Sequence, residues 1–357
     1  MSPVDTSFLN PSSRVFLSNV PSDIDYSKLT ILNVRNSPKV PLSDDIPRPD
    51  VTVESIKIPA DTDRHPISVD VYRPKQAGDA VLPALIYLPG GGWGVAAQGA
   101  HPYLATKLAA EANCAVLFVN YSLSPEVRFP VALEECYTVV SHATTPELAE
   151  KLKVDPTRVA LGGDSAGGNL TAAVTILAKQ RDSLVNKIKF QILYYPATND
   201  DFETESYKKF GEGYYLSNGL IKLFYNNYKT EEGKDSILLC PGKATVEDVA
   251  GVPPALLVTG EADVLRDEGE SYGVKLLQAN VPVTSVRMNG VIHGFMSIPM
   301  LHSEETLTVI DITTKALCKH RNAVDNLLKQ QYRKHLATQS PPKHSKQLPW
   351  DHSNTLT

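Results

Sequence analysis

The sequence predicts an α/β protein built around a mostly parallel sheet. From about residue 82, apolar runs of strand length alternate with segments of helical length, and such alternation requires crossover connections and a sheet buried on both faces. A Gly-x-Ser-x-Gly motif at residues 163–167 stands between an apolar run and a helical one. The composition agrees, because 357 residues with 42% hydrophobic and 21% charged side chains suffice for one large domain with an elaboration, or for two domains.

The individual elements are predicted from apolar runs bounded by glycine, proline and polar turns. Residues 51–60 and 67–74 alternate like an antiparallel hairpin. Further strands are expected at Leu82–Leu88, Ala115–Asn120, Arg158–Gly162, Phe190–Tyr195, Ala255–Thr259 and Val283–Met288. Helices are expected at Pro102–Ala112, Val131–Ala143, Ala166–Lys179, Glu268–Ala279 and Glu304–Tyr332.

The chain is expected to divide into a core and a cap. A long polar and aromatic segment interrupts the alternation, and its part from Phe202 to Tyr228 has a helix-like body. It is expected to cover the site, the alternative being a peripheral helix. The N-terminal residues are expected to form a short helix or two over the site, the alternative being a disordered leader. The predicted parts are an N-terminal cap segment (1–50), the first part of the core (51–197), a cap insertion (198–250), the second part of the core (251–334) and a polar tail expected to be disordered (335–357).

Charge and cysteine content favour a small-molecule ligand. The formal net charge of −5 gives no reason to expect nucleic acid or an anionic membrane as a partner. The four cysteines are scattered without a zinc-like motif and indicate a reducing compartment. No apolar stretch approaches the roughly 18 residues of a membrane span, and the N-terminus lacks a signal-peptide pattern, so a cytoplasmic location is expected. An exposed edge strand or a final helix can support a homodimer, which nothing in the sequence demands.

Ser165 is the candidate nucleophile. Gly163 and Gly167 flank it two positions on either side, so the backbone can turn sharply between strand and helix without side-chain clashes. A serine hydroxyl needs a base within hydrogen-bond reach and donors for the oxyanion that its attack creates. The helix that starts near Ala166 points free N–H groups toward that charge. The alternative is a Gly/Ser turn that has no chemistry.

An acid and a histidine follow in the order that this arrangement needs, each just past a later strand. His293 is the only one of the nine histidines placed in a loop directly after a late strand. An aspartate at its other ring nitrogen would orient the ring and stabilise the imidazolium. Asp263 is the first choice, because it stands first after its strand. The alternatives in the same loop are Glu261, Asp267 and Glu268.

A glycine-rich loop at Leu88–Gly94 follows the strand that starts at Leu82. Consecutive glycines let backbone N–H groups converge on one point with no side chain in the way. The loop is therefore expected to form the second half of the oxyanion site. A phosphate cradle is the competing use, but neither phosphate-binding glycine motif occurs here.

Five motifs stand together over about residues 50–320: GGGW in the glycine-rich loop, YSLSPEVRFPVALEE at Tyr121–Glu135, GDSAGGN at Gly163–Asn169, DVLRDEG at Asp263–Gly269 and HGF at His293–Phe295. Through them the sequence resembles the hormone-sensitive-lipase-like branch of the α/β-hydrolase esterases. The resemblance implies an α/β-hydrolase fold with a helical cap over the acyl pocket. It also implies a catalytic triad of Ser165, Asp263 and His293, and an oxyanion hole formed by the backbone N–H groups of Gly91, Gly92 and Ala166.

Two positions depart from that family. A histidine usually stands where this sequence has Pro89, and proline brings a rigid backbone without a ring hydrogen bond. An arginine usually stands where this sequence has Ser122, so a charge near the site is lost. Neither position belongs to the implied triad. The departures therefore bear on the shape of the oxyanion loop and on the substrate range rather than on the reaction.

Motifs and resemblance together predict a serine carboxylic-ester hydrolase that works through an acyl-enzyme, needs no metal or organic cofactor, and acts on a short- to medium-chain acyl ester or an ester of a small metabolite. The alternative is an amidase, a lactonase or a deacetylase of a secondary metabolite, because such an enzyme would use the same residues. A non-catalytic receptor on this fold would be marked by loss of the serine or the histidine, and both are present.

Eight aromatic residues are expected either to line an apolar pocket or to pack the cap onto the core: Trp93, Phe202, Tyr207, Phe210, Tyr214, Tyr215, Phe224 and Tyr225.

Overall fold

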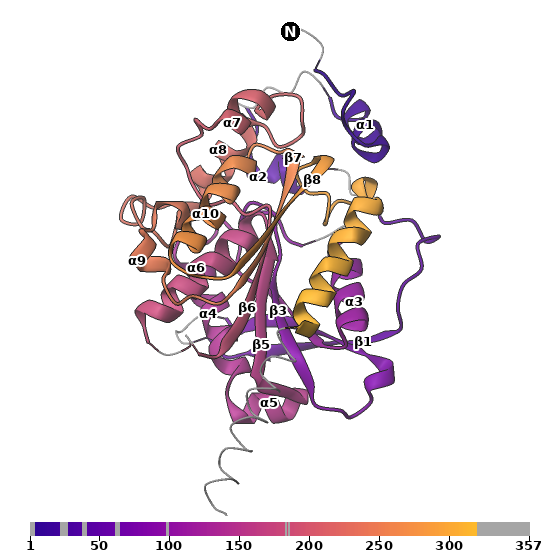
Figure 1. Cartoon of the computed structure of the whole chain (residues 1–357), viewed down its shortest axis with the longest axis vertical. Coiled ribbons are helices and arrows are strands. Elements are labelled where there is room, and N and C mark those ends of the chain that lie inside the picture. Colours follow the sequence, from indigo (N-terminus) through magenta and orange to yellow (C-terminus); the bar gives the residue numbers. More distant parts are fainter. Residues whose placement is uncertain are drawn as a thin grey trace, which may run out of the picture.

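An eight-stranded sheet lies at the centre of the molecule (Figure 1). The computed structural model describes residues 4–21, 28–37, 41–60, 65–97, 100–182, 184 and 186–319. The strands are β1 (Val51–Ile58), β2 (Ile67–Pro74), β3 (Leu82–Leu88), β4 (Ala115–Asn120), β5 (Val154–Asp164), β6 (Ile188–Tyr194), β7 (Ala255–Ala262) and β8 (Val283–Ile292). Their order across the sheet is β1-β2-β4-β3-β5-β6-β7-β8. β1 and β2 pair antiparallel, as do β2 and β4, and all other neighbours are parallel.

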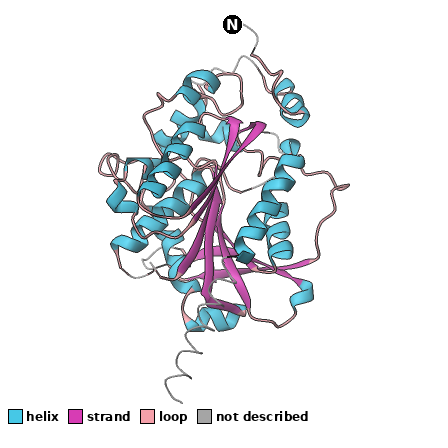
Figure 2. Cartoon of the chain, viewed as in Figure 1, coloured by secondary structure: helices cyan, strands magenta, loops and turns pink. Residues whose placement is uncertain are grey.

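Helices cover both faces of this sheet (Figure 2). The helices are α1 (Pro11–Ser18), α2 (Ile31–Arg35), α3 (His101–Ala112), α4 (Val131–Ala143), α5 (Pro146–Leu152), α6 (Ala166–Gln180), α7 (Glu205–Phe210), α8 (Asn218–Tyr228), α9 (Val246–Val249) and α10 (Arg266–Gln278). Residues 304–319 form a further helix. Figure 1 shows α6 and α10 on one face of the sheet, and α3 with the helix of residues 304–319 on the other.

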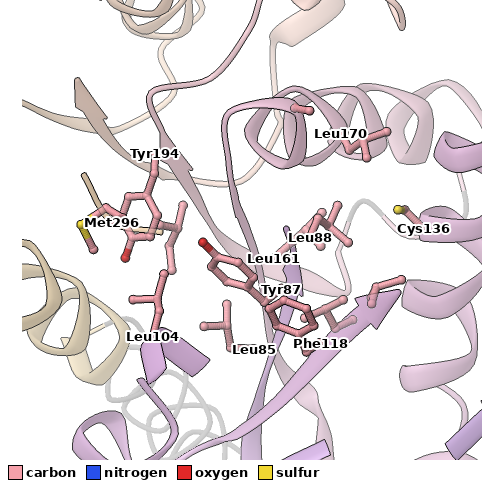
Figure 3. Close-up of a cluster of buried hydrophobic side chains, with 14 of the residues drawn as sticks. Leu85, Tyr87, Leu88, Leu104, Phe118, Cys136, Leu161, Leu170, Tyr194 and Met296 are labelled. Carbon is pink, nitrogen blue, oxygen red and sulfur yellow. The ribbon is translucent and has the colours of Figure 1, made fainter. Parts of the chain in front are cut away.

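The core is built from the central parallel strands, which are apolar on both faces. Leu85 and Leu161 are fully buried and lie beside the stacked rings of Tyr87 and Phe118 (Figure 3), whose centroids are 5.7 Å apart. A parallel sheet between two helical layers needs such continuous apolar runs. The mostly parallel sheet predicted from the alternating pattern is therefore confirmed, and so is the antiparallel edge hairpin.

Helix α6 approaches the end of β3 so closely that only glycine fits between them. A Cβ atom on Gly167 or on Gly163 would overlap the carbonyl oxygen of Leu88. Ser165, between the two glycines, has φ 56° and ψ −117°, a backbone conformation that non-glycine residues rarely adopt. The sharp corner between β5 and α6 therefore depends on these glycines.

Helices α1 and α2 and the helices α7 and α8 of the insertion lie beyond the carboxyl ends of the parallel strands, whereas α9, at the end of the insertion, packs against α10 (Figure 1). The N–H of Asn10 donates to the carbonyl of Gly290 at 2.7 Å, and the Tyr214 hydroxyl donates to the carbonyl of Asp5 at 2.7 Å. These bonds attach the N-terminal segment both to the end of β8 and to the insertion.

The sequence suggests one helix-like body over Phe202–Tyr228, but the structure has two helices there, α7 and α8. Gly213 and Tyr215, between them, have φ values of 82° and 77°, which end helical geometry. Ser217 then starts α8, because its hydroxyl accepts the N–H of Leu220 at 3.1 Å. Helical spacing alone did not reveal this turn.

Other predicted boundaries shift by a few residues. Strands β7 and β8 reach Ala262 and Ile292, beyond the predicted ends at Thr259 and Met288, because their last residues also pair with each other. The short helix α5 was not predicted. The predicted tail and the last turns of the predicted Glu304–Tyr332 helix lie outside the described residues.

None of the helices in the described part of the chain combines the length and apolar character that a membrane crossing needs.

Glu268, in the first turn of α10, holds the start of the insertion. Its carboxylate accepts the backbone N–H groups of Thr198 at 2.6 Å and Asn199 at 3.1 Å. Burial raises the pKa of Glu268 to about 8 from an ordinary 4.5, because desolvation of the anion outweighs these two hydrogen bonds. The insertion is thus attached to the core through a carboxyl group that is protonated at neutral pH.

We expect Gly167→Ala to destabilise the protein by about 3 kcal/mol, because the new methyl group must displace the end of β3. Gly273→Ala in α10 is the matched control, since its Cβ would make only ordinary contact with Leu257, 3.5 Å away; this change should be neutral or stabilising by up to about 1 kcal/mol. Urea unfolding of both variants measures the difference. Equal stabilities would contradict the close approach described above.

We expect the stability of the wild type to fall as pH rises from 4.5 to about 8, because the folded protein then holds a proton on Glu268 that the unfolded chain has released. A single such group changes the free energy of unfolding by about 1.4 kcal/mol per pH unit, and Glu268→Gln should remove that slope. Glu270→Gln is the control. Burial raises the pKa of Glu270, but hydrogen bonds from Arg287 and Thr259 outweigh burial and hold that pKa below its ordinary 4.5. Above that pH the group is therefore mostly ionised in both the folded and the unfolded chain. Urea unfolding at several pH values should leave the slope of that control unchanged.

Candidate active site

Three side chains from separate loops meet beyond the carboxyl ends of β5, β7 and β8. His293 directly follows β8, and its Nε2 lies 3.0 Å from Ser165 Oγ. Its Nδ1 lies 2.8 Å from Asp263 Oδ2, and Asp263 Oδ1 accepts the N–H of Leu265 at 2.9 Å. Asp263 and His293 are buried, whereas Ser165 is partly exposed. This geometry allows the serine to pass a proton to an imidazole that a buried carboxylate orients.

The acidic neighbours of Asp263 are engaged elsewhere. Glu261 accepts the N–H of Gly290 at 2.8 Å. Asp267 accepts the N–H of Ser206 at 2.7 Å. Glu268 binds the start of the insertion, as described above. Of the four acids that the sequence offered, the structure therefore brings Asp263 to the histidine.

The residue before the nucleophile, Asp164, is a buried anion with three partners. Its Oδ1 accepts the Tyr87 hydroxyl and the Gly90 N–H, each at 2.9 Å, and lies 3.1 Å from His101 Nε2. Burial raises the pKa of Asp164, but the charge of His101 and these hydrogen bonds outweigh burial and hold that pKa below its ordinary value. The Gly-x-Ser-x-Gly motif put Asp164 at the end of an apolar strand, but the sequence did not reveal what this residue does there. A charged residue there signals that buried partners must exist.

Asp164 also fixes the start of the glycine-rich loop, through the N–H of Gly90. The next two glycines have φ values of 128° and 58°, which a side chain would disfavour. In the described part of the chain no hydrogen bond uses the N–H of Gly91 or Gly92. The N–H of Ala166 is the first in α6 and has no carbonyl one turn earlier in the helix. Donors are thus available on both sides of Ser165, as the oxyanion of a tetrahedral adduct requires.

A cavity of about 400 Å³ opens at Ser165. Its floor contains Gly90–Gly92, Ala166 and His293, and the N-terminal segment and the insertion complete its walls. The walls are mostly apolar, with Phe16, Val20, Leu29, Val34, Trp93, Val95, Tyr215, Leu216, Leu220, Ile221, Phe224, Ile298 and Met300. A site of this kind suits a small ligand with apolar groups on a polar centre.

The eight aromatic residues singled out in the sequence divide between two roles. Trp93, Tyr215 and Phe224 line the cavity. The remaining five pack the insertion, where for example the rings of Phe202 and Tyr207 meet edge to face at 5.5 Å. The sequence did not indicate a role for Phe16 of α1. This residue lines the cavity, and its ring centroid lies 5.1 Å from that of Tyr215. An isolated aromatic residue in a polar leader carries no signal of such a contact.

The two departures from the family pattern are accommodated locally. The carbonyl of Pro89 accepts the Tyr121 hydroxyl at 2.7 Å. Ser122 donates its N–H and its hydroxyl to the two oxygens of the buried Glu135, at 2.6 and 2.7 Å. Each substituted position therefore still has a hydrogen-bonded partner behind the loop.

Candidate metal ligands are dispersed in the structure. Among the described residues, no three His, Cys, Asp or Glu side chains are grouped so that they could hold a metal ion. Three of the four cysteines are buried, and none of the four is among the residues that line the cavity.

Comparisons with known proteins place the chain in a family. A family model described as alpha/beta hydrolase fold matches residues 85–297. An esterase structure from Rhizomucor miehei superposes with a TM-score of 0.82 at 40% identity, covering 88% of this chain and 98% of that one. The ethyl acetate hydrolase of Pseudomonas putida is 33% identical over 72% of this chain and 80% of its own length. The arylesterase of Saccharolobus solfataricus is 28% identical over 84% of this chain and 96% of its own length. The chain therefore belongs to the hormone-sensitive-lipase-like family of α/β-hydrolase enzymes, whose relatives named here are carboxylic ester hydrolases.

Proposed function

We propose that this protein hydrolyses small carboxylic esters through an acyl-enzyme on Ser165. The observation that carries the proposal is the continuous line of hydrogen-bond distances from Ser165 Oγ through His293 to Asp263, at 3.0 and 2.8 Å. Relatives named as esterases support the bond class.

The proposed reaction has two halves. Ser165 Oγ attacks the ester carbonyl carbon while His293 Nε2 takes its proton, and Asp263 stabilises the imidazolium. His293 then gives that proton to the departing alcohol, which leaves the acyl group on the serine. In the second half His293 deprotonates a water molecule, which attacks the acyl-enzyme and releases the carboxylic acid. The proposed donors to both oxyanions are the N–H groups of Gly91, Gly92 and Ala166.

The proposed substrate carries apolar groups of small to medium size on both sides of the ester. A cavity of about 400 Å³ with mostly apolar walls supports this choice. The proposed cap consists of the N-terminal segment and the insertion at 198–250, because both contribute walls of the cavity. The names of two relatives, an ethyl acetate hydrolase and an arylesterase, point to esters of the same size class.

We expect the wild type to hydrolyse p-nitrophenyl esters within the series from acetate to decanoate, and Ser165→Ala or His293→Ala to lower kcat by about 10⁴-fold or more. Ser303→Ala and His302→Ala, outside the cavity lining, are controls that should keep wild-type turnover. A fluorophosphonate probe should label the wild type and leave Ser165→Ala unlabelled.

Two outcomes would change the proposal in different ways. A folded wild type that is inert on every ester but labelled by the probe would move the reaction to amides or lactones, which p-nitroacetanilide and a γ-lactone test directly. A wild type that the probe does not label would leave a ligand receptor instead of an enzyme.

We expect Phe224→Ala to move the preferred acyl or alcohol chain toward longer groups. The Phe224 ring lies directly over Gly92, where an added Cβ would overlap it, so truncation enlarges the cavity beside the proposed oxyanion site. The kcat/KM values over the p-nitrophenyl series measure the shift. Phe202→Ala removes a similar ring from the insertion outside the cavity lining and should leave the preference unchanged. A shared effect of both variants would assign the change to loosening of the insertion.

A further inference from the structure

Helix α2 of the N-terminal segment lies against the back of the glycine-rich loop. Ile31 is buried there, and a Cβ atom on Gly94 would lie only 2.7 Å from its Cδ1. Four residues further along α2, Arg35 Nε donates to the carbonyl oxygen of Gly94 at 2.6 Å, and Arg35 Nη2 donates to the carbonyl oxygen of Ser124 at 2.7 Å. One guanidinium group therefore bridges two separate loops of the core.

Glu126 fixes the orientation of this guanidinium. Its two oxygens accept Nη1 at 2.6 Å and Nη2 at 2.7 Å of Arg35, the side-by-side geometry that is strongest for an arginine and a carboxylate. The hydrogen bonds from Arg35 lower the pKa of Glu126 to about 2, so the pair stays charged at any pH at which the enzyme would be assayed. Four of the five guanidinium N–H groups are thereby used, and Arg35 is only 21% exposed.

The carbonyl of Gly94 belongs to the same tight turn as the proposed oxyanion donors. The carbonyl of Gly91 accepts the N–H groups of Gly94 at 3.1 Å and Val95 at 2.8 Å, and the carbonyl of Trp93 accepts the N–H of Ser124 at 2.8 Å. Gly91 and Gly92 hold positive φ angles inside this turn. Because glycine has an unusually wide choice of backbone conformations, contacts from outside add to these internal hydrogen bonds in holding the turn in the conformation that aims its N–H groups.

We propose that Arg35 is a positioning residue for the oxyanion loop, and that the N-terminal segment thereby belongs to the catalytic apparatus as well as to the wall of the cavity. The inference rests on the proposed function, because it assigns the loop its role in binding the oxyanion. Arg35 is not among the described residues that line the cavity. It acts by holding the carbonyl of Gly94, and with it the N–H groups of Gly91 and Gly92, in place before the reaction begins.

The test compares Arg35→Met with the wild type on the preferred p-nitrophenyl ester. We expect kcat to fall roughly 10-fold or more while KM changes less than about 2-fold, because only the charged intermediate uses the loop. A trifluoromethyl ketone, which forms a tetrahedral adduct on the serine, should lose affinity in step with kcat/KM. The alcohol product should bind as before. Arg35→Lys should retain an intermediate kcat, and ethylguanidinium added to Arg35→Met should restore part of it.

Matched variants separate this role from general loss of structure. Arg48→Met removes another arginine of the N-terminal segment, one whose polar contacts among the described residues are with Leu42 and Asp44, and should keep the wild-type kcat. If Arg35→Met does not fold by circular dichroism, Arg35→Lys and Glu126→Gln carry the test. A wild-type kcat in the Arg35 variants, an effect confined to KM, or unchanged affinity for the ketone would overturn the inference. Ser165→Ala is assayed in parallel: its full activity would refute the proposed function, whereas an inactive Ser165→Ala beside a normal Arg35→Met would refute the role of Arg35 alone.

Discussion

The close contact between the start of α6 and the end of β3 is the constraint on which the rest of the structure depends. Gly163 and Gly167 leave no room for a side chain against Leu88, so strand and helix meet at a corner that holds Ser165 at φ 56°. The same corner aims the hydroxyl at His293 and frees the first N–H groups of the helix. It also sets the glycine-rich loop beside the nucleophile, since that loop begins directly after Leu88.

Two buried carboxylates next to this corner show how surroundings decide charge. Asp164 has an imidazole, a hydroxyl and a backbone N–H as partners, and its pKa lies below the ordinary value although burial raises it. Glu268 has backbone N–H partners without a cation, and burial raises its pKa to about 8. The first therefore supplies a fixed negative charge at the start of the glycine-rich loop, and the second is a mostly neutral anchor for the insertion. Asp164 thereby connects the glycine-rich loop to the end of β5, and Glu268 connects the insertion to the start of α10.

The fold and the short list of candidate catalytic residues could be predicted from the sequence, because both depend on local patterns. Alternating apolar and helical segments predicted the sheet. Chain order selected Ser165 and His293 and placed Asp263 first among four acids. The structure brings Ser165 Oγ within 3.0 Å of His293 Nε2 and Asp263 Oδ2 within 2.8 Å of His293 Nδ1. Less of the N-terminal segment and the insertion could be predicted in this way. The break between α7 and α8 depends on two residues with positive φ. The contacts of Phe16 and Arg35 join segments that are distant in the sequence, where no periodicity connects them.

By itself, the sequence determined which residues can carry the chemistry and the order of strands and helices that supports them, because glycine spacing and hydrophobic period act through the nearest neighbours in the chain. Only the tertiary structure decided which acid meets His293 and which aromatic residues face the cavity. It also decided that Arg35 of the N-terminal segment hydrogen-bonds to the glycine-rich loop. These outcomes depend on distances between atoms from different loops. Such distances are set by the packing of the whole sheet and its cap rather than by any local preference.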